Sequence, residues 1–171
     1  MTPRIPLFLL IASFALAPRA QEAQTKSPES SYHDHDYGFT LTPPAFESDD
    51  DAKVVTIAQF LAPAADGFAA NLGLQRQKFA GGFEAFVKTS DAQFEQMDFK
   101  VLSKHGAKIG SHASNEWVYT GTLGGNAMKF HALAVEQGEY VFLLTGTALE
   151  QNFDDYEPQF KAALASFRFD K

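Results

Sequence analysis

The sequence predicts an α+β domain, built as an α/β/α sandwich in which helices cover both faces of a central, mainly antiparallel β-sheet. Three strands are expected between residues 116 and 147, and the glycine-containing turns between them are typical of an antiparallel meander. The last strand, residues 140–147, is apolar on both faces, as expected of a strand in the middle of a covered sheet. Two helical patterns elsewhere supply the outer layers.

The first twenty residues are expected to be a signal peptide. Arg4 supplies a positive charge, and residues 5–17 form an apolar run that is too short to span a membrane comfortably. Small residues then lead to a cleavage site near Ala20; an uncleaved N-terminal anchor is the alternative. Residues 21–36 are polar and are expected to form a flexible linker. The globular domain is therefore predicted to comprise residues 37–171.

The first half of the domain alternates between strand and helix patterns. Strands are expected where apolar residues alternate or run together, at residues 39–42, 54–61 and 71–77. A helix is expected over residues 83–97, with a possible break at Ser90 and Asp91. Its apolar stripe consists of Phe83, Phe86, Val87, Phe94 and Met97. Two short strands, residues 99–102 and 107–109, are expected on either side of a turn at Lys104-His-Gly106.

The second half ends in a helix after the meander. Turns are expected at Gly124-Gly-Asn126 and at Gln137-Gly-Glu139, between strands at residues 116–123, 127–135 and 140–147. Asp154 or Asp155 is expected to cap the last helix. Pro158 is expected in its first turn, where no helical hydrogen bond is lost. A short final strand is expected to end at Phe169.

Composition excludes several classes of site. The chain has 171 residues and no Cys, which excludes disulfides, thiolate nucleophiles and cysteine-ligated metals. Its net charge is −7; removal of residues 1–20 takes away Arg4 and Arg19, so that 12 − 21 gives −9. An acidic surface disfavours nucleic acid by charge alone. We therefore expect no nucleic-acid partner and no membrane span after cleavage of the signal peptide.

The order of these elements resembles the PsbP-like superfamily. The segments that carry the resemblance are residues 37–44, 71–75 and 83–97, the meander, and residues 153–160 and 166–169. The superfamily includes the photosystem II protein PsbP, Mog-type Ran-binding proteins and DcrB-like bacterial secreted proteins. The resemblance implies an α/β/α sandwich around a mainly antiparallel sheet. It also implies a binding, assembly or extrinsic-subunit role rather than catalysis, and a leader argues against a nuclear role.

The strongest candidate for chemistry is a metal site at His33, Asp34, His35 and Asp36. Imidazole and carboxylate groups suit divalent ions such as Zn²⁺, Cu²⁺, Ni²⁺ or Mn²⁺. In an extended segment the two histidines point one way and the two aspartates the other, so further ligands are needed. His105, His112 or His131 could supply them. The alternative is that the segment is a solvated linker.

No recognisable catalytic motif is present in the sequence. It lacks a Gly-x-Ser-x-Gly elbow, a His-Glu-x-x-His helix, a phosphate-binding loop and a dinucleotide fingerprint. His105, His112 and His131 are each expected to be ordinary surface or half-buried residues. Trp117 and Tyr119 are expected to be core or rim aromatics.

The sequence therefore predicts a secreted or periplasmic, non-catalytic binding or accessory protein of PsbP-like fold. We expect no cofactor, a monomer, and an unknown protein partner in the cell envelope. Two alternatives are carried forward. One is a metal-binding protein that uses His33–Asp36, and the other is a small hydrolase of unrecognised type.

Overall fold

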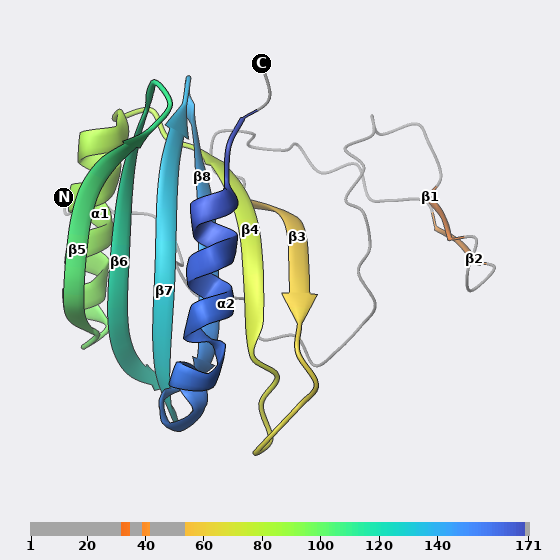
Figure 1. Cartoon of the computed structure of the whole chain (residues 1–171). Helices are drawn as coiled ribbons and strands as arrows, with labels where there is room; N and C mark the ends of the chain where they lie inside the picture. The colour runs from red at the N-terminus through yellow and green to blue at the C-terminus, as the bar shows by residue number, and fades with distance from the viewer. Residues whose placement is uncertain (1–31, 35–38, 42–53, 170–171) are drawn as a thin grey trace, which may run out of the picture.

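The computed structural model describes residues 32–34, 39–41 and 54–169, and its main body is a six-stranded antiparallel sheet with two helices (Figure 1). The predicted signal peptide, residues 1–20, lies outside these residues. The elements are β1 (Tyr32–Asp34), β2 (Phe39–Leu41), β3 (Val54–Leu61), β4 (Asn71–Lys78), α1 (Phe83–Gln96), β5 (Lys100–Ile109), β6 (His112–Leu123), β7 (Asn126–Gln137), β8 (Tyr140–Leu149), the 3-10 turn η1 (Glu150–Asn152) and α2 (Phe153–Ser166).

The strand order of the main sheet is β3-β4-β8-β7-β6-β5, and every neighbouring pair is antiparallel. A separate two-stranded antiparallel sheet is formed by β1 and β2. The strand that is apolar on both faces, β8, lies between β4 and β7, as the sequence predicted. The predicted α+β class and the antiparallel character of its sheet are confirmed.

Alternate residues of β7 belong to different clusters of buried side chains. Ala132 packs in a cluster with Phe94 of α1, whereas its neighbour Leu133 packs in a cluster with Leu164 of α2. Successive side chains of a strand point to opposite faces of a sheet, so each helix covers its own set of β7 residues. Figure 1 shows α2 in front of the sheet and α1 behind it.

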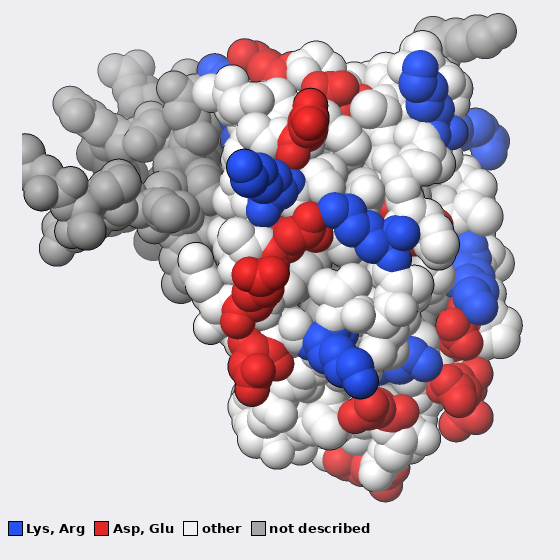
Figure 2. Space-filling model, turned by 90° about the vertical axis from the view of Figure 1, so that its left-hand side faces the viewer, with Lys and Arg blue, Asp and Glu red and all other residues white. Residues whose placement is uncertain are grey.

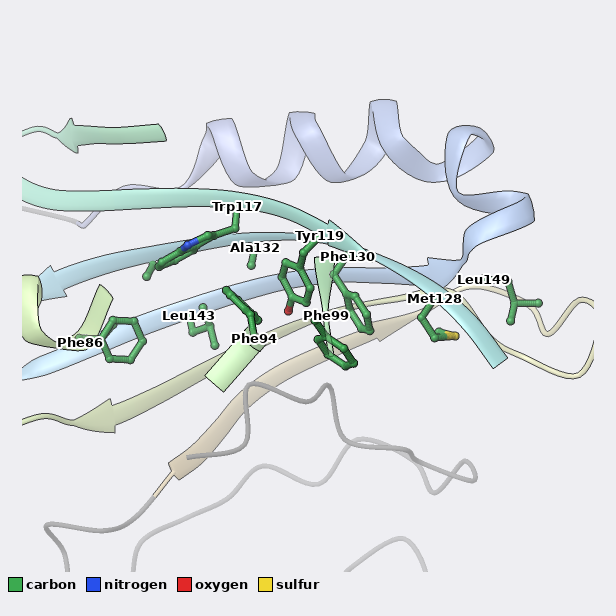
Figure 3. Close-up of a cluster of buried hydrophobic side chains, with 12 residues drawn as sticks. Phe86, Phe94, Phe99, Trp117, Tyr119, Met128, Phe130, Ala132, Leu143 and Leu149 are labelled. Carbon is green, nitrogen blue, oxygen red and sulfur yellow. The ribbon is translucent and has the colours of Figure 1, made fainter. Parts of the chain in front are cut away.

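The cluster under α1 is largely aromatic (Figure 3). The Tyr119 ring lies 4.4 Å from Phe94, 4.7 Å from Phe130 and 5.9 Å from Phe99 between ring centroids. Trp117 is fully buried beside them, and its indole nitrogen donates to the Asp91 carboxylate at 3.1 Å. The predicted role of Trp117 and Tyr119 as core aromatics is confirmed.

The cluster under α2 depends on a close approach at one glycine. Gly146 of β8 lies beneath the ring of Phe160, and a Cβ placed on this glycine would lie 2.5 Å from that ring. A real Cβ would therefore force the ring to move. The missing side chain allows α2 to pack closely on the sheet.

The structure corrects two boundaries in the first half. The segments predicted as two short strands form one strand, β5, and Lys104-His-Gly106 lies within it. The turn is instead at Gly110, which has a φ of 61°. Helix α1 continues through Ser90, whose hydroxyl donates to the Phe86 carbonyl at 2.9 Å, so the predicted break does not occur.

The last helix also begins differently from the prediction. Asn152 is at the N-cap position and makes no side-chain cap, while Asp154 and Asp155 lie within the first turn. Pro158 is the sixth residue of the helix, beyond the first turn where it was predicted. Residues 167–169 form no strand; Phe167 and Phe169 pack against Phe142 instead. Within the described ranges, no helix is long and apolar enough to cross a membrane.

Candidate docking surface on strand β3

Strand β3 lies at one edge of the main sheet, and within the described part of the chain it pairs only with β4. An edge strand leaves half of its backbone N–H and C=O groups without a partner strand, which makes it a template for further pairing. Pairing with β4 shifts register between Thr56 and Ala58, so Ile57 is a bulge residue. After the bulge, residues 58–61 run regularly to the end of the strand.

Most side chains of β3 are apolar, and four of the large ones are unusually exposed. Phe60 is 64% exposed, Ile57 and Leu61 are each 46% exposed, and Val54 is 38% exposed. The strand, Val-Val-Thr-Ile-Ala-Gln-Phe-Leu, contains no charged residue. We call the edge and side chains of Val54–Leu61 the β3 surface. Neighbouring exposed apolar side chains of this kind are typical of a surface that binds something.

The opposite edge of the sheet, β5, is protected in the ways that natural edge strands usually are. It carries Lys100, Lys104 and Lys108, and a register shift against β6 lies between Val101 and Ser103. Lys104 also forms an ion pair with Asp91 of α1 at 2.5 Å. Figure 2 shows basic and acidic groups interspersed on this side of the molecule. The β3 edge has a bulge but no charged side chain. It therefore lacks the lysines that protect the β5 edge.

The second feature that could support chemistry is a carboxylate–imidazole pair. His131 of β7 is 1% exposed, and its Nε2 lies 2.5 Å from a carboxylate oxygen of Glu116 on β6, which is 44% exposed. The Nδ1 atom of His131 is buried and has no hydrogen-bond partner. His105 of β5 is directly opposite Glu116 in the strand pairing. Because its Nε2 is occupied by Glu116 and its Nδ1 is buried, His131 cannot reach a substrate as a base without rearrangement.

His131 is buried, which corrects the expectation of a surface or half-buried residue. Its pairing could have been predicted from the turn at Gly124 and Gly125, where both residues have positive φ. A two-residue turn there places His131 opposite Val118, and Glu116 is then its diagonal neighbour. The signal was therefore present in the hairpin register rather than in any local motif.

The predicted metal segment is only partly described. His33 and Asp34 lie on β1, opposite Thr40 and Phe39 of β2, whereas His35 and Asp36 lie outside the described residues. Of the other candidate ligands, His112 makes a hydrogen bond through Nδ1 with the Glu136 carbonyl oxygen at 2.9 Å. Among the described side chains, no group of three His, Asp or Glu residues is placed to hold a metal ion. A metal site at His33–Asp36 stays a prediction.

The Tyr119 hydroxyl is another buried polar group that has no hydrogen-bond partner among the described residues. Tyr119 is fully buried, and its hydroxyl makes no hydrogen bond. Burial disfavours the phenolate, so the pKa of Tyr119 is raised well above its ordinary value. The hydroxyl therefore stays protonated, and it belongs to the aromatic core rather than to an accessible site.

Comparisons with known proteins show the fold. No protein-family model matches the chain, and no curated protein matches it. Among solved structures, a protein of unknown function from Pseudomonas aeruginosa, PA94, is similar over 83% of this chain and 97% of its own, with 19% identity and a TM-score of 0.57. At this level of identity, the similarity establishes a shared fold.

Two other solved structures are similar to the chain. Cyanobacterial PsbP from Synechocystis sp. PCC 6803 has 10% identity and a TM-score of 0.47, over 89% of this chain and 98% of its own. LpqN of Mycobacterium tuberculosis, which is involved in cell envelope biogenesis, has 12% identity and a TM-score of 0.37, over 75% and 83%.

Proposed function

We propose that this protein is a secreted or periplasmic accessory protein of PsbP-like fold that binds a protein partner in the cell envelope and performs no catalysis. In this proposal the sheet is the middle layer of an α/β/α sandwich, and the partner adds an extended, apolar segment to the edge of β3. The observation that carries the proposal is the β3 surface, where Phe60 is 64% exposed on an uncharged edge strand. The resemblance of the sequence to secreted PsbP-like proteins supports the location.

Strand addition suits this surface better than binding of a charged ligand. The unpaired backbone groups of an edge strand can bind any extended peptide, and pockets for alternate side chains then give specificity. The β3 surface has no charged side chain to select a nucleic acid, an anionic lipid or a metal ion. A net charge of −7 further disfavours nucleic acid.

The exposed side chains can supply useful binding energy. Full burial of a Phe, Leu, Ile or Val side chain is worth roughly 1.5–3 kcal/mol. Phe60 is 64% exposed, so covering it contributes about 1–2 kcal/mol. That corresponds to a change in affinity of roughly 5- to 30-fold from one side chain. Phe60 is therefore the position where a substitution should affect binding most.

The test is site-specific photo-crosslinking followed by binding measurements. A photoreactive amino acid is placed at position 60 on β3 and, in a second variant, at position 102 on β5. Leu102 is a matched control, because it is also a large apolar side chain, 48% exposed, on the opposite edge. The protein crosslinked from position 60 is then purified, and its affinity is measured for the wild-type chain, Phe60→Glu and Leu102→Glu.

The proposal predicts at least about tenfold weaker binding for Phe60→Glu, because the change removes apolar contact and places a charge at the interface. Leu102→Glu should bind like the wild type. Equal affinity of all three proteins for the crosslinked partner would show that β3 is not the binding surface. Crosslinking from position 102 but not from position 60 would contradict the proposal in the same way.

A further inference from the structure

The geometry points to a small-molecule site on β4 and β8: we infer that Asn71 and Thr147 bind a neutral, hydroxyl-rich ligand of the sugar class. Val141 and Leu143 of β8 lie in the cluster under α1, and Thr147 points to the same face because alternate residues of a strand do so. Asn71 of β4 is directly opposite Thr147. Opposite residues have Cβ atoms about 5 Å apart, so one small molecule can contact both side chains. The site does not use the edge of β3, so the inference goes beyond the proposed function.

Two buried polar atoms at this place have no hydrogen-bond partner. Asn71 is 7% exposed and Thr147 is 1% exposed, and neither Asn71 Oδ1 nor Thr147 Oγ1 makes a hydrogen bond with the described part of the chain. The Asn71 amide nitrogen donates to the Ala69 carbonyl at 3.1 Å, which leaves Oδ1 as the free atom. Such atoms cost folding free energy, and an apolar side chain of similar shape would avoid the cost. A polar pair that is kept in a buried place indicates a functional use.

Gly73 lies on the same face of β4, two residues from Asn71, and no described side chain packs on it. A Cβ placed on Gly73 would meet no atom within 4 Å, whereas a Cβ on Gly146 would lie 2.5 Å from the Phe160 ring. Gly73 is not among the glycines with positive φ, so its backbone conformation does not require glycine. Glycine inside a strand often marks a place where a ligand comes close to the backbone. Thr145, opposite Gly73, is 6% exposed, so the open space at Gly73 is a recess beside buried side chains.

The residues around this recess are polar and uncharged, which selects the class of ligand. Gln75 follows Gly73 on the same face of β4, and Thr145 and Thr147 continue the face on β8. These residues supply neither a cation for an anionic ligand nor a carboxylate for a cationic one. An apolar ligand would leave Asn71 Oδ1 and Thr147 Oγ1 without partners. A ligand hydroxyl can donate to Asn71 Oδ1 and can donate to or accept from the Thr147 hydroxyl, so a neutral molecule with several hydroxyl groups fits best.

Access is from the part of the sheet that α1 does not cover. Figure 1 shows α1 behind β5 and β6, and the strand order places β4 beyond β7 and β8. Gly73 and Gln75 are half-buried, whereas Asn71 and Thr147 are buried. A ligand therefore enters over Gly73, and a rotation of the Asn71 side chain brings the two buried oxygens into contact with it.

Titration of the full-length protein with glucose and with N-acetylglucosamine tests this inference, and glucuronic acid is the charged comparison. Binding is followed by NMR, through the backbone amide signals of Gly73 and Thr147. Gly73→Val fills the recess, and Thr147→Val removes the hydroxyl but keeps the shape of the side chain. Thr120→Val is the matched control. Thr120 is a half-buried threonine of β6 next to Tyr119, which lies in the cluster under α1, so Thr120 points to the opposite face.

The inference predicts that the neutral sugars shift these amide signals and that glucuronic acid does not. Thr147→Val should weaken sugar binding roughly 2- to 10-fold, which corresponds to the loss of one hydrogen bond. Gly73→Val should weaken it at least about tenfold, because the new side chain occupies the space that the ligand needs. Without sugar, Thr147→Val should unfold at the same temperature as the wild type or higher, because it removes a buried polar group that has no partner. Thr120→Val should bind sugar like the wild type.

Three results would overturn the inference. The first is the absence of any shift with the neutral sugars at millimolar concentration. The second is equal sugar affinity of Gly73→Val, Thr147→Val and the wild type, because the sugar would then bind elsewhere. The third is a lower unfolding temperature for Thr147→Val than for Thr120→Val without sugar binding, because this would show that an ordered water only satisfies the Thr147 hydroxyl.

The same variants separate this inference from the proposed function. Thr147→Val should bind the protein crosslinked from position 60 with wild-type affinity. If Thr147→Val and Gly73→Val bind sugar normally but Phe60→Glu weakens partner binding, the inference is wrong and the proposed function stands. If both variants lose sugar binding but Phe60→Glu binds the partner normally, the inference stands and the proposed function is wrong.

Discussion

Replacement of Tyr119 by Phe should stabilise the protein, and more so at high pH. The Tyr119 side chain is fully buried, and its hydroxyl has no hydrogen-bond partner. A buried polar group without a partner costs about 1–3 kcal/mol of folding free energy. Tyr119→Phe removes that group and keeps the ring, which stacks on Phe130 at 4.7 Å between centroids. We expect the free energy of unfolding at pH 7 to rise by about 1 kcal/mol or more.

The pH dependence follows from the raised pKa of Tyr119, whose cause is burial. In the unfolded chain the phenol ionises near pH 10, whereas in the folded chain it stays protonated at that pH. Above pH 10 the folded state therefore binds more protons than the unfolded state. The contribution of Tyr119 to the free energy of unfolding is therefore fully present below pH 10, and it falls by about 1.4 kcal/mol per pH unit above pH 10. Tyr119→Phe has no phenol to ionise at this position. The difference in the free energy of unfolding between this variant and the wild type should therefore grow above pH 10.

Urea unfolding of both proteins between pH 7 and pH 11 checks this prediction. Tyr156→Phe is the control, because Tyr156 lies half-buried on α2 and its hydroxyl is not among the buried atoms without a partner. The free energy of unfolding of Tyr156→Phe should differ little from that of the wild type at pH 7 or at pH 11. A loss of stability of more than about 1 kcal/mol in Tyr119→Phe at pH 7 would refute the reasoning, because it would show that the hydroxyl has a favourable partner.

Two further substitutions test the packing and the buried pair. Gly146→Ala should destabilise by about 1–3 kcal/mol, because the new Cβ displaces the Phe160 ring, whereas Gly73→Ala, which meets no atom within 4 Å, should cost much less. Equal thermal midpoints of these two variants would contradict the packing account. Glu116→Ala should cost about 1–3 kcal/mol in urea unfolding, because the buried His131 loses its hydrogen-bond partner. Unchanged stability would mean that the pair contributes nothing.

Much of the fold could be predicted because its strands have clear patterns. The two apolar faces of β8 correctly indicated a central strand, and the paired glycines at Gly124 and Gly125 correctly located a hairpin. β5 was wrongly divided because Gly106 suggests a turn. Within the pairing it simply faces Asn115, and the true irregularity is the register shift after Val101. Turn residues alone do not distinguish a turn from a glycine inside a strand.

The candidate site was harder to predict because it depends on what covers each strand. The sequence of β3 is mostly apolar and uncharged, and nothing local shows that Phe60 is exposed. That exposure follows from the position of β3 at the edge of the sheet, which is a property of strand order. The pairing of His131 with Glu116 likewise required the hairpin register. The metal site at His33–Asp36, by contrast, was predicted from residue types alone.

The central claim is that the β3 surface binds an envelope protein, and the affinity of Phe60→Glu for the partner crosslinked at position 60 tests it most directly. The account predicts at least about tenfold weaker binding than the wild type, with Leu102→Glu unchanged. Wild-type affinity in a correctly folded Phe60→Glu variant would contradict it.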